Sequence, residues 1–298
     1  YFSAVYQHSE LLAIPRPELL LFKLELFGKD GLGACEVITD YDYTLTKYKS
    51  EGHRLLNSFE GLQVSLSSDQ KAMCYALADK YYPIEADPEY PYQEKLQLMD
   101  TWYSLKNKII LESAISRADI TKSLAEGRIL LRNGIDSLFE TLEANKVPLT
   151  VVSAGAGDII AESFKKLPSL SNLAIHSNFI EFDENGVARD FIQPVLTSLT
   201  KADKLSSPPL RKNAIVMGDL PSDLMLARHH NPYQVISVGF YNRDFKFEPY
   251  EQFDLLVLND GNLQAVEFLL ATLARSSKKP QQDSLQPLHE LISALSFA

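Results

Sequence analysis

The sequence predicts an α/β protein: a core with a parallel β-sheet and helices on both faces, and a second, helical segment inserted into it. Three observations lead to this expectation. Short apolar runs rich in β-branched residues, typical of buried parallel strands, alternate with segments of helical spacing. About 110 residues separate the first predicted strand end from the second, far more than one strand-to-strand crossover needs. Most of that interval has helical spacing, so it is expected to form a cap over the sheet edge.

The predicted elements follow in chain order. Residues 1–33 form an N-terminal helical extension that the glycines at 31 and 33 end. The five expected strands are 35–40, 147–155, 213–219, 233–240 and 253–260. The expected core helices are 133–146, 157–167 and 222–230. A hairpin with Asn185–Gly186 at its turn is expected over 180–191.

These elements divide the chain into expected domains. The core comprises residues 34–49 and 126–275, and the cap comprises residues 50–125. Within the cap, helices are expected at 69–81, at about 91–114 and at 117–126, the first preceded by a capping box from Ser67 to Gln70. Residues 276–298 are expected to form a polar linker and a short C-terminal helix.

Composition excludes several classes of function. The net charge of −10 argues against binding to nucleic-acid polymers or to anionic membranes. No apolar run approaches the roughly 18–20 residues that a membrane span needs. Two cysteines, Cys35 and Cys74, are too few for a disulfide framework or a zinc cluster. A cytoplasmic location is therefore expected.

Polar residues stand where three predicted strands end. The carboxyl ends of parallel strands are where ligands bind in such sheets. Each residue alone has an ordinary explanation as a strand end, a helix cap or a surface charge, but their order along alternating strands is hard to obtain by chance. In chain order they are Asp40 and Asp42, then Ser153, then Asp219 and Asp223, and Lys201 stands in the segment between the second and the last of these strand ends.

This order resembles the haloacid dehalogenase (HAD) superfamily of aspartate-nucleophile phosphatases. Its four motifs are Asp-x-Asp-x-Thr, a Ser or Thr, a Lys, and Gly-Asp-x-x-x-Asp. The stretches "DYDYTLT", "YYPIEADP", "VVSAGAGDII", "SNFIEFDENG", "LTKADK" and "GDLPSDLMLA" further resemble the cytosolic pyrimidine 5′-nucleotidase family, also called cytosolic 5′-nucleotidase III. The resemblance covers about residues 34–275.

The resemblance implies the chemistry of these residues. Asp40 would be the nucleophile that forms an aspartyl-phosphate, and Asp42 the general acid and base. Mg²⁺ would be held by the Asp40 carboxylate, the Asp42 backbone carbonyl and Asp219, with Asp223 supporting them. The phosphoryl oxygens would be bound by Ser153, the Ala154 amide and Lys201.

The cap would contact the nucleobase of a nucleoside 5′-monophosphate. By position, Phe59 and Glu60 stand where pyrimidine-acting relatives carry His-Asn. Glu85 matches the family's base-contacting glutamate, and Tyr103 its stacking aromatic residue. Glu85 as a surface acid and Tyr103 as a packing residue are the structural alternatives, and the neighbouring Trp102 is expected in the core.

Two departures from the family pattern leave the substrate open. Phe59 could complete an aromatic sandwich suited to a cationic methylated purine, as in the branch acting on 7-methylguanosine monophosphate, yet that branch favours Trp where Tyr103 stands. Leu220-Pro221-Ser222 replaces the usual loop between the last two acids, which could alter substrate contacts. Pyrimidine monophosphates are the first expectation. The alternatives are 7-methylguanosine monophosphate, another phosphomonoester, and non-catalytic nucleotide binding.

Overall fold

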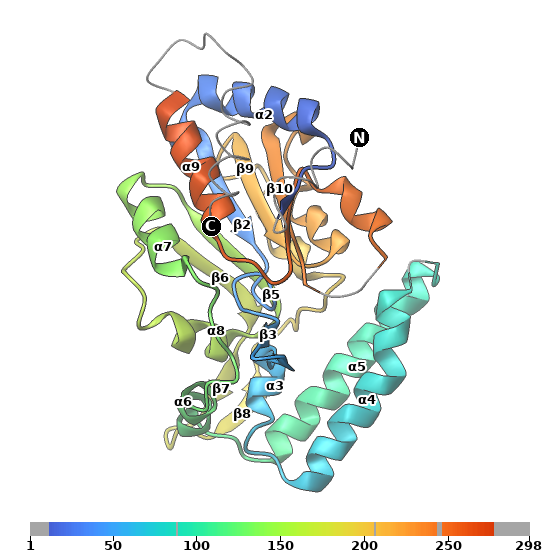
Figure 1. Cartoon of the computed structure of the whole chain (residues 1–298). Coiled ribbons are helices and arrows are strands. Elements are labelled where there is room, and N and C mark those ends of the chain that lie inside the picture. Colours follow the sequence, from blue (N-terminus) through green and yellow to red (C-terminus); the bar gives the residue numbers. More distant parts are fainter. Residues whose placement is uncertain (1–11, 88, 206, 243–245, 277–298) are drawn as a thin grey trace.

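A seven-stranded sheet forms the centre of the protein, seen in a computed structural model that describes residues 12–87, 89–205, 207–242 and 246–276 (Figure 1). The strand order is β1-β11-β10-β9-β2-β5-β6. In chain order the strands are β1 (Leu12–Ala13), β2 (Cys35–Thr39), β5 (Leu149–Ala156), β6 (Leu173–Asn178), β9 (Asn213–Gly218), β10 (Val235–Tyr241) and β11 (Leu255–Leu258). All five predicted strands are present.

The register of the sheet brings the strand ends together. β2 lies between β9 and β5 and runs parallel to both, with Val37 opposite Ile215 on one side and Leu149 on the other. The strand is buried along its whole length, as its apolar sequence predicts. The residues that follow β2 and β9, and the last residues of β5, therefore meet at one edge of the sheet.

As predicted, helices cover both faces of this sheet; those on one face are α-helices and those on the other are 3₁₀ helices. One face packs against α2 (Pro17–Asp30), α7 (Ile135–Ala144), α8 (Gly157–Phe164) and α9 (Gln264–Ser276). The other face packs against the 3₁₀ helices η2 (Lys201–Lys204), η3 (Pro221–Ala227) and η5 (Glu248–Gln252). Two further 3₁₀ turns are η1 (Leu32–Ala34) and η4 (Pro232–Gln234). Side chains alternate along β2, so Val37 enters the first layer and Ile38 the second.

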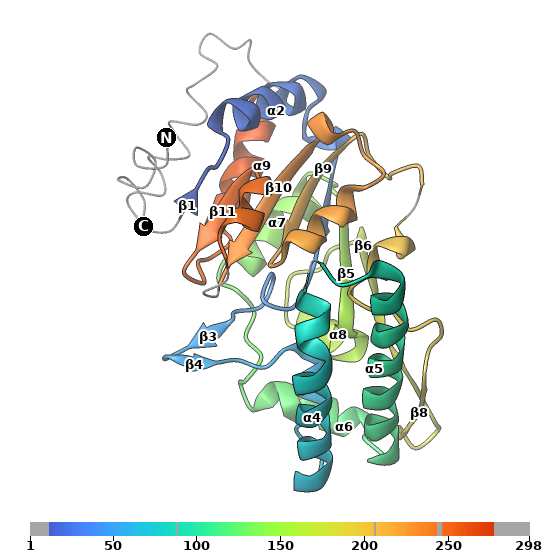
Figure 2. The same cartoon turned by 90° about the vertical axis from the view of Figure 1, so that its right-hand side faces the viewer.

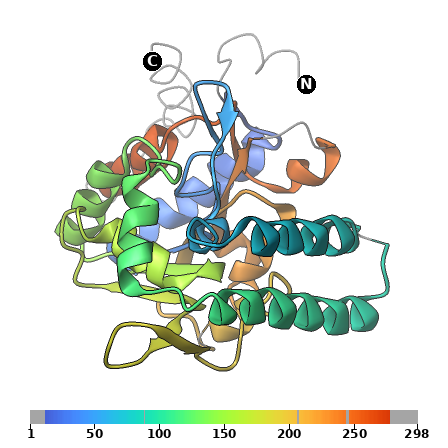
Figure 3. The ribbon, with the colours of Figure 1, turned by 90° about the horizontal axis from the view of Figure 1, so that it is seen from below.

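Between β2 and α7 the chain forms the elements of the predicted cap, which we call the cap elements. They are β3 (Lys49–Ser50), β4 (His53–Arg54), α3 (Ser58–Leu62), α4 (Ser68–Ala86), α5 (Tyr92–Glu112) and α6 (Arg117–Ala125). The capping box predicted from Ser67 to Gln70 is present at the start of α4. Figure 2 shows α4 and α5 below the carboxyl edge of the sheet, and Figure 3 shows the two helices side by side.

The predicted hairpin is formed by β7 (Ile180–Phe182) and β8 (Ala188–Phe191). It packs against the cap elements: the Ala188 amide donates to the Ile115 carbonyl at 2.8 Å. Ile180 and Phe191 share an apolar cluster with Ile110 of α5. The hairpin belongs to the core part of the sequence and thus packs it against the inserted part.

Two expectations about local structure are wrong, and one further strand is missing from the prediction. Residues 12–13 form the antiparallel edge strand β1 rather than helix, because their backbone pairs with β11, which would otherwise be the edge of the sheet. Residues 222–230 were expected to be α-helical, but η3 closes i→i+3 hydrogen bonds, such as Arg228 N–H to the Met225 carbonyl. Strand β6 was not predicted.

Two predicted segments lie outside the described residues: the first part of the N-terminal extension (1–11) and most of the linker and tail (277–298). Within the described part of the chain, no helix combines the length and the apolarity needed to cross a membrane.

Candidate active site

Asp40 follows the central strand β2 and lies where the predicted residues converge. Its amide donates to the Met217 carbonyl of β9 at 3.0 Å, so the parallel pairing continues to the strand end. Asp219 follows β9 directly, and Ser153 lies near the end of β5 on the other side. The sheet order therefore places Asp40 between two further polar side chains.

Lys201 joins two of the acidic side chains. Its Nζ lies 2.5 Å from Asp40 Oδ1 and 2.7 Å from Asp223 Oδ1. Burial alone would lower the pKa of Lys201, but the carboxylates of Asp223 and Asp40 raise it above its ordinary value. Lys201 therefore remains an ammonium near neutral pH and supplies a fixed positive charge beside Asp40.

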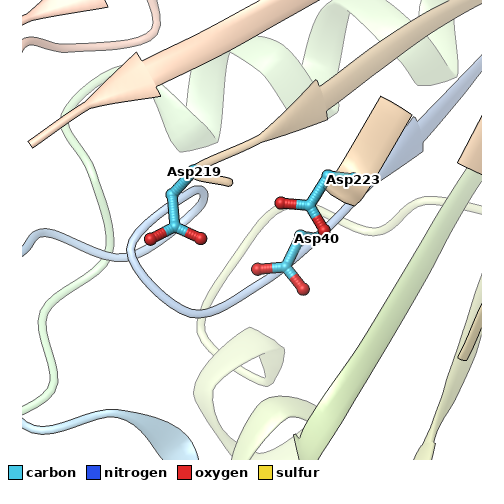
Figure 4. Close-up of side chains that lie close together, drawn as sticks. All are labelled: Asp40, Asp219 and Asp223. Atoms are coloured by element: carbon cyan, nitrogen blue, oxygen red, sulfur yellow. The ribbon is translucent and has the colours of Figure 1, made fainter. Parts of the chain in front are cut away.

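Three buried carboxylates meet at this site, those of Asp40, Asp219 and Asp223 (Figure 4). Each offers an oxygen atom that lies within 4.8 Å of the oxygens of the other two. Burial raises the pKa of Asp40 well above its ordinary value against the attraction of Lys201, and the neighbouring carboxylates add to the rise. Lys201 balances only part of this negative charge. An all-oxygen donor set with surplus negative charge is what Mg²⁺ prefers, so the residues present fit this ion.

The Leu220-Pro221-Ser222 departure leaves the acidic cluster intact. η3 turns tightly enough that a Cβ on Gly218 would lie 2.2 Å from Asp223 Cβ, which explains why glycine precedes Asp219. Asp223 Oδ2 accepts a hydrogen bond from the Leu220 amide at 3.0 Å. Leu220 itself lines the cleft beside the acids.

Asp42 points away from the three-carboxylate cluster and toward the cap. Its carboxylate accepts hydrogen bonds from the Ser58 amide at 2.6 Å and the Ser58 hydroxyl at 2.7 Å. The Ser58 hydroxyl in turn accepts from the Ala156 amide at 3.1 Å. Burial raises the pKa of Asp42 to about 6, although the bonds from Ser58 act in the opposite direction. Gly155 permits this approach, because a Cβ there would meet Ser58 Oγ at 1.9 Å.

Two of the candidate phosphate ligands, Ser153 and Ala154, belong to β5, which lies on the opposite side of β2 from the strand that precedes Asp219. Ser153 is buried, and its hydroxyl accepts from the Gly155 amide at 3.0 Å. Ser153, Ala154 and Lys201 line the same cleft as Asp40. The helix expected from residue 157 does begin at Gly157, directly after β5 ends at Ala156.

The cleft extends from these residues into the cap, with a volume of about 510 Å³. All four candidate base contacts line it: Phe59, Glu60, Glu85 and Tyr103. Glu85 Oε1 accepts from the Ser198 hydroxyl at 2.5 Å, which fixes its carboxylate. Glu60 has other partners, since it caps its own helix at Asn57 and pairs with Arg54 at 2.9 Å.

Sequence reasoning missed Ser58 as a partner of Asp42, Lys106 as a residue that lines the cleft, and the position of Trp102 at the cleft. Ser58 immediately precedes Phe59, but its bond to Asp42 depends on how the cap folds back. Lys106 faces the cleft one helical turn after Tyr103, a spacing that could have revealed it. Trp102 is buried as expected, and it also lines the cleft.

Several known proteins are similar to this chain in sequence and in fold. The model of the pyrimidine 5′-nucleotidase (UMPH-1) family matches residues 43–274. The 7-methylguanosine phosphate-specific 5′-nucleotidase of Gallus gallus is 27% identical over 271 residues, covering 86% of this chain and 94% of the relative. The putative cytosolic 5′-nucleotidase 3 of Caenorhabditis elegans is 28% identical over 281 residues, covering 87% and 74%.

The crystal structure of cytosolic 5′-nucleotidase IIIB bound to cytidine superposes with a TM-score of 0.75 at 23% identity, covering 90% of this chain and 94% of that one. This likeness confirms the HAD-like fold that the four motifs predicted. The family match spans most of the chain, including the cap elements and the last three motifs. The chain therefore belongs to the pyrimidine 5′-nucleotidase family, whose members are 5′-nucleotidases of the HAD fold.

Proposed function

We propose that this enzyme hydrolyses nucleoside 5′-monophosphates, pyrimidine nucleotides by preference, in a Mg²⁺-dependent reaction through an aspartyl-phosphate. The observation that carries the proposal is the convergence of Asp40, Lys201, Asp219 and Asp223 in a cleft that also contains aromatic side chains. We propose a cytoplasmic location as well, in keeping with the relative named as cytosolic.

Asp40 acts as the nucleophile. Its carboxylate oxygen forms a bond to phosphorus while the bond from phosphorus to the nucleoside oxygen breaks, and Asp42 gives that oxygen its proton. Asp42, now ionised, takes a proton from a water molecule that attacks the phosphorus of the aspartyl-phosphate. Inorganic phosphate leaves, and both aspartates return to their starting states.

The phosphoryl group is held by groups on three sides. Lys201 places its charge 2.5 Å from the Asp40 oxygen, where it neutralises an incoming phosphoryl oxygen. The Ser153 hydroxyl and the Ala154 amide donate hydrogen bonds from β5. Asp40, Asp219 and the Asp42 carbonyl would hold Mg²⁺, with Asp223 supporting them, and the bound ion would neutralise charge on the phosphoryl group.

The nucleobase is stacked by aromatic residues of the cap. Tyr103 and Phe59 provide flat faces, and Glu85 offers a carboxylate to a donor on the base edge. The runner-up substrate is 7-methylguanosine monophosphate, favoured by the similarity to nucleotidases named for it and by the aromatic residue at Phe59. Another phosphomonoester is the remaining alternative.

The proposal is tested by measuring phosphate release from CMP, UMP, AMP, GMP, 7-methyl-GMP and phosphoserine. We expect hydrolysis of nucleotides that requires added Mg²⁺, is lost with EDTA and returns when the ion is restored. Protein that is folded and has Mg²⁺ bound, but releases no phosphate from any of the six compounds, would contradict the proposal. Faster release from phosphoserine than from every nucleotide would favour the other phosphomonoester.

A change at Ser58 should move the pH dependence of this reaction. Ser58→Ala removes the hydroxyl that stabilises ionised Asp42, so the pKa of Asp42 rises. Because Asp42 must be protonated to release the nucleoside, the alkaline limb of the kcat profile should move upward by about one pH unit, the equivalent of one charge-assisted hydrogen bond. Ser65→Ala, which removes an exposed hydroxyl, is the control. An unmoved limb would show that Ser58 does not tune Asp42.

A further inference from the structure

Lys106 places a positive charge inside the aromatic part of the cleft. It lies on α5, one turn after Tyr103, and only 9% of its surface is exposed. Its Nζ is 3.5 Å from the centre of the Tyr103 ring, 4.1 Å from that of Phe59 and 5.0 Å from that of Trp102. These three rings form what we call the aromatic cage, and the ammonium of Lys106 occupies it.

The ammonium is held by the rings rather than by a hydrogen-bonded anion. Among the described residues, Lys106 Nζ has no hydrogen-bond or ion-pair partner. Burial lowers the pKa of Lys106 to about 8, while the carboxylates of Glu85 and Asp42 and the Cys74 thiol oppose that change. The side chain is therefore mostly charged at neutral pH, and its three N–H donors face the cleft with capacity to bind a ligand.

A cage that already contains a cation is a poor site for a second one. Empty aromatic cages attract cationic rings because the ring faces are negative. A 7-methylguanine ring carries a positive charge, and here it would meet Lys106 among the same three rings. Two positive charges among the same three rings repel each other strongly where water is excluded. A neutral base avoids that repulsion.

A neutral base would also give Lys106 the acceptor it lacks. A carbonyl oxygen on the base edge can accept from the ammonium, while an adjacent N–H donates to Glu85, whose position Ser198 fixes. A donor and an acceptor side by side match the edge of a neutral pyrimidine.

We propose that Lys106 is a specificity-determining residue that selects neutral, carbonyl-bearing nucleobases and rejects cationic ones. This inference rests on the proposed nucleotidase function and deepens it: the aromatic residue at Phe59, which alone favours a methylated purine, acts together with a lysine that disfavours it.

Nucleoside binding tests the inference without any phosphate chemistry. Trp102 is the single tryptophan of the chain and forms part of the cage, so its fluorescence reports what enters. We expect wild type to bind uridine, whose C4 carbonyl lies beside its N3–H, at least about tenfold more tightly than 7-methylguanosine. Lys106→Met, similar in length but uncharged, should reduce this ratio of affinities about tenfold or more. Lys108→Met, which removes an exposed lysine of the same helix, should leave the ratio unchanged. Calorimetry gives an independent reading.

The outcomes separate this inference from the proposed function. Three results would overturn it. The ratio of the affinities for the two nucleosides could be equal in wild type and Lys106→Met, wild type could prefer 7-methylguanosine, or neither nucleoside could bind at millimolar concentration. Lys106→Gln repeats the test with a polar, uncharged side chain if the Met variant fails to fold. Altered nucleoside selectivity without phosphate release from any nucleotide would remove the proposed function and leave the role of Lys106 in base selection standing.

Discussion

Asp40→Asn is expected to abolish phosphate release, with kcat reduced on the order of 10⁴-fold or more, the scale on which loss of a nucleophile acts. Asparagine has nearly the same shape, and its amide oxygen can still accept from Lys201, which lies 2.5 Å from Asp40 Oδ1. It carries no negative charge and is a very poor nucleophile toward phosphorus. The change therefore removes the chemistry and keeps the surroundings of the site.

Initial rates of phosphate release from CMP measure this loss, and circular dichroism checks that the fold is kept. Asp69→Asn removes an exposed carboxylate of α4 and should leave the rate unchanged. Wild-type protein should also retain radioactive phosphate after acid quenching during turnover, whereas Asp40→Asn should not. A variant that keeps more than a tenth of the wild-type rate would show that another group attacks the phosphorus.

The sheet could be predicted because its strands are buried on both faces. β2, β9 and β10 are nearly continuous apolar runs, so each is recognisable without its neighbours. β6 lies at the sheet edge and is only half-buried, and its His176 and Ser177 interrupt the apolar pattern. β1 has two residues, too few to show any periodicity. These strands are defined by pairing with distant segments, which local sequence does not reveal.

The residues of the candidate site also differ in whether local sequence could predict their positions. Asp40, Asp219 and Asp223 stand beside strand ends, so strand prediction alone places them at one edge. Ser58 reaches Asp42 from α3, and Lys106 reaches the cleft from α5, so both contacts depend on how these helices sit above the sheet. No spacing rule relates Ser58 to Asp42, whereas the three-residue spacing of Lys106 from Tyr103 does indicate a shared helix face.

Arg132 is the residue on which the loop after Asp42 depends most. It lies where the chain returns from the cap, and its side chain is fully buried. The guanidinium donates to the carbonyls of Tyr43 at 2.7 Å, Thr44 at 2.9 Å and Thr46 at 3.0 Å, and it pairs with Asp260 at 3.0 Å. Burial lowers the pKa of Arg132 to about 10, and Asp260 opposes this.

These bonds fix an unfavourable backbone conformation next to Asp42. Tyr43 has a φ of 62°, in the left-handed region, which costs a residue with a side chain about 1–2 kcal/mol. Its carbonyl is held by Arg132 and also by the Asn242 amide at 2.7 Å. Because Tyr43 directly follows Asp42, the same bonds orient the loop that carries this residue, which we propose as the general acid.

Arg132→Met is therefore expected to destabilise the protein by about 3–5 kcal/mol, since it leaves Asp260 as a buried charge without its cation and removes one hydrogen bond from each of three carbonyls. For a protein of this size that corresponds to a Tm lower by roughly 10 °C. Thermal unfolding followed by circular dichroism measures the change. Arg128→Met, at an exposed position on the same returning segment, should alter stability by less than about 0.5 kcal/mol.

The double variant Arg132→Met with Asp260→Asn separates the ion pair from the carbonyl bonds. Asparagine at 260 removes the stranded charge, so the double variant should lose less stability than the two single losses added together. The carbonyls of Tyr43, Thr44 and Thr46 would still lack the hydrogen bonds from Arg132, so kcat should stay low even where stability partly returns. Strict additivity of the stability losses would mean that the ion pair contributes no coupling energy. Full recovery of kcat would mean that Arg132 acts on stability alone and does not position the loop beside Asp42.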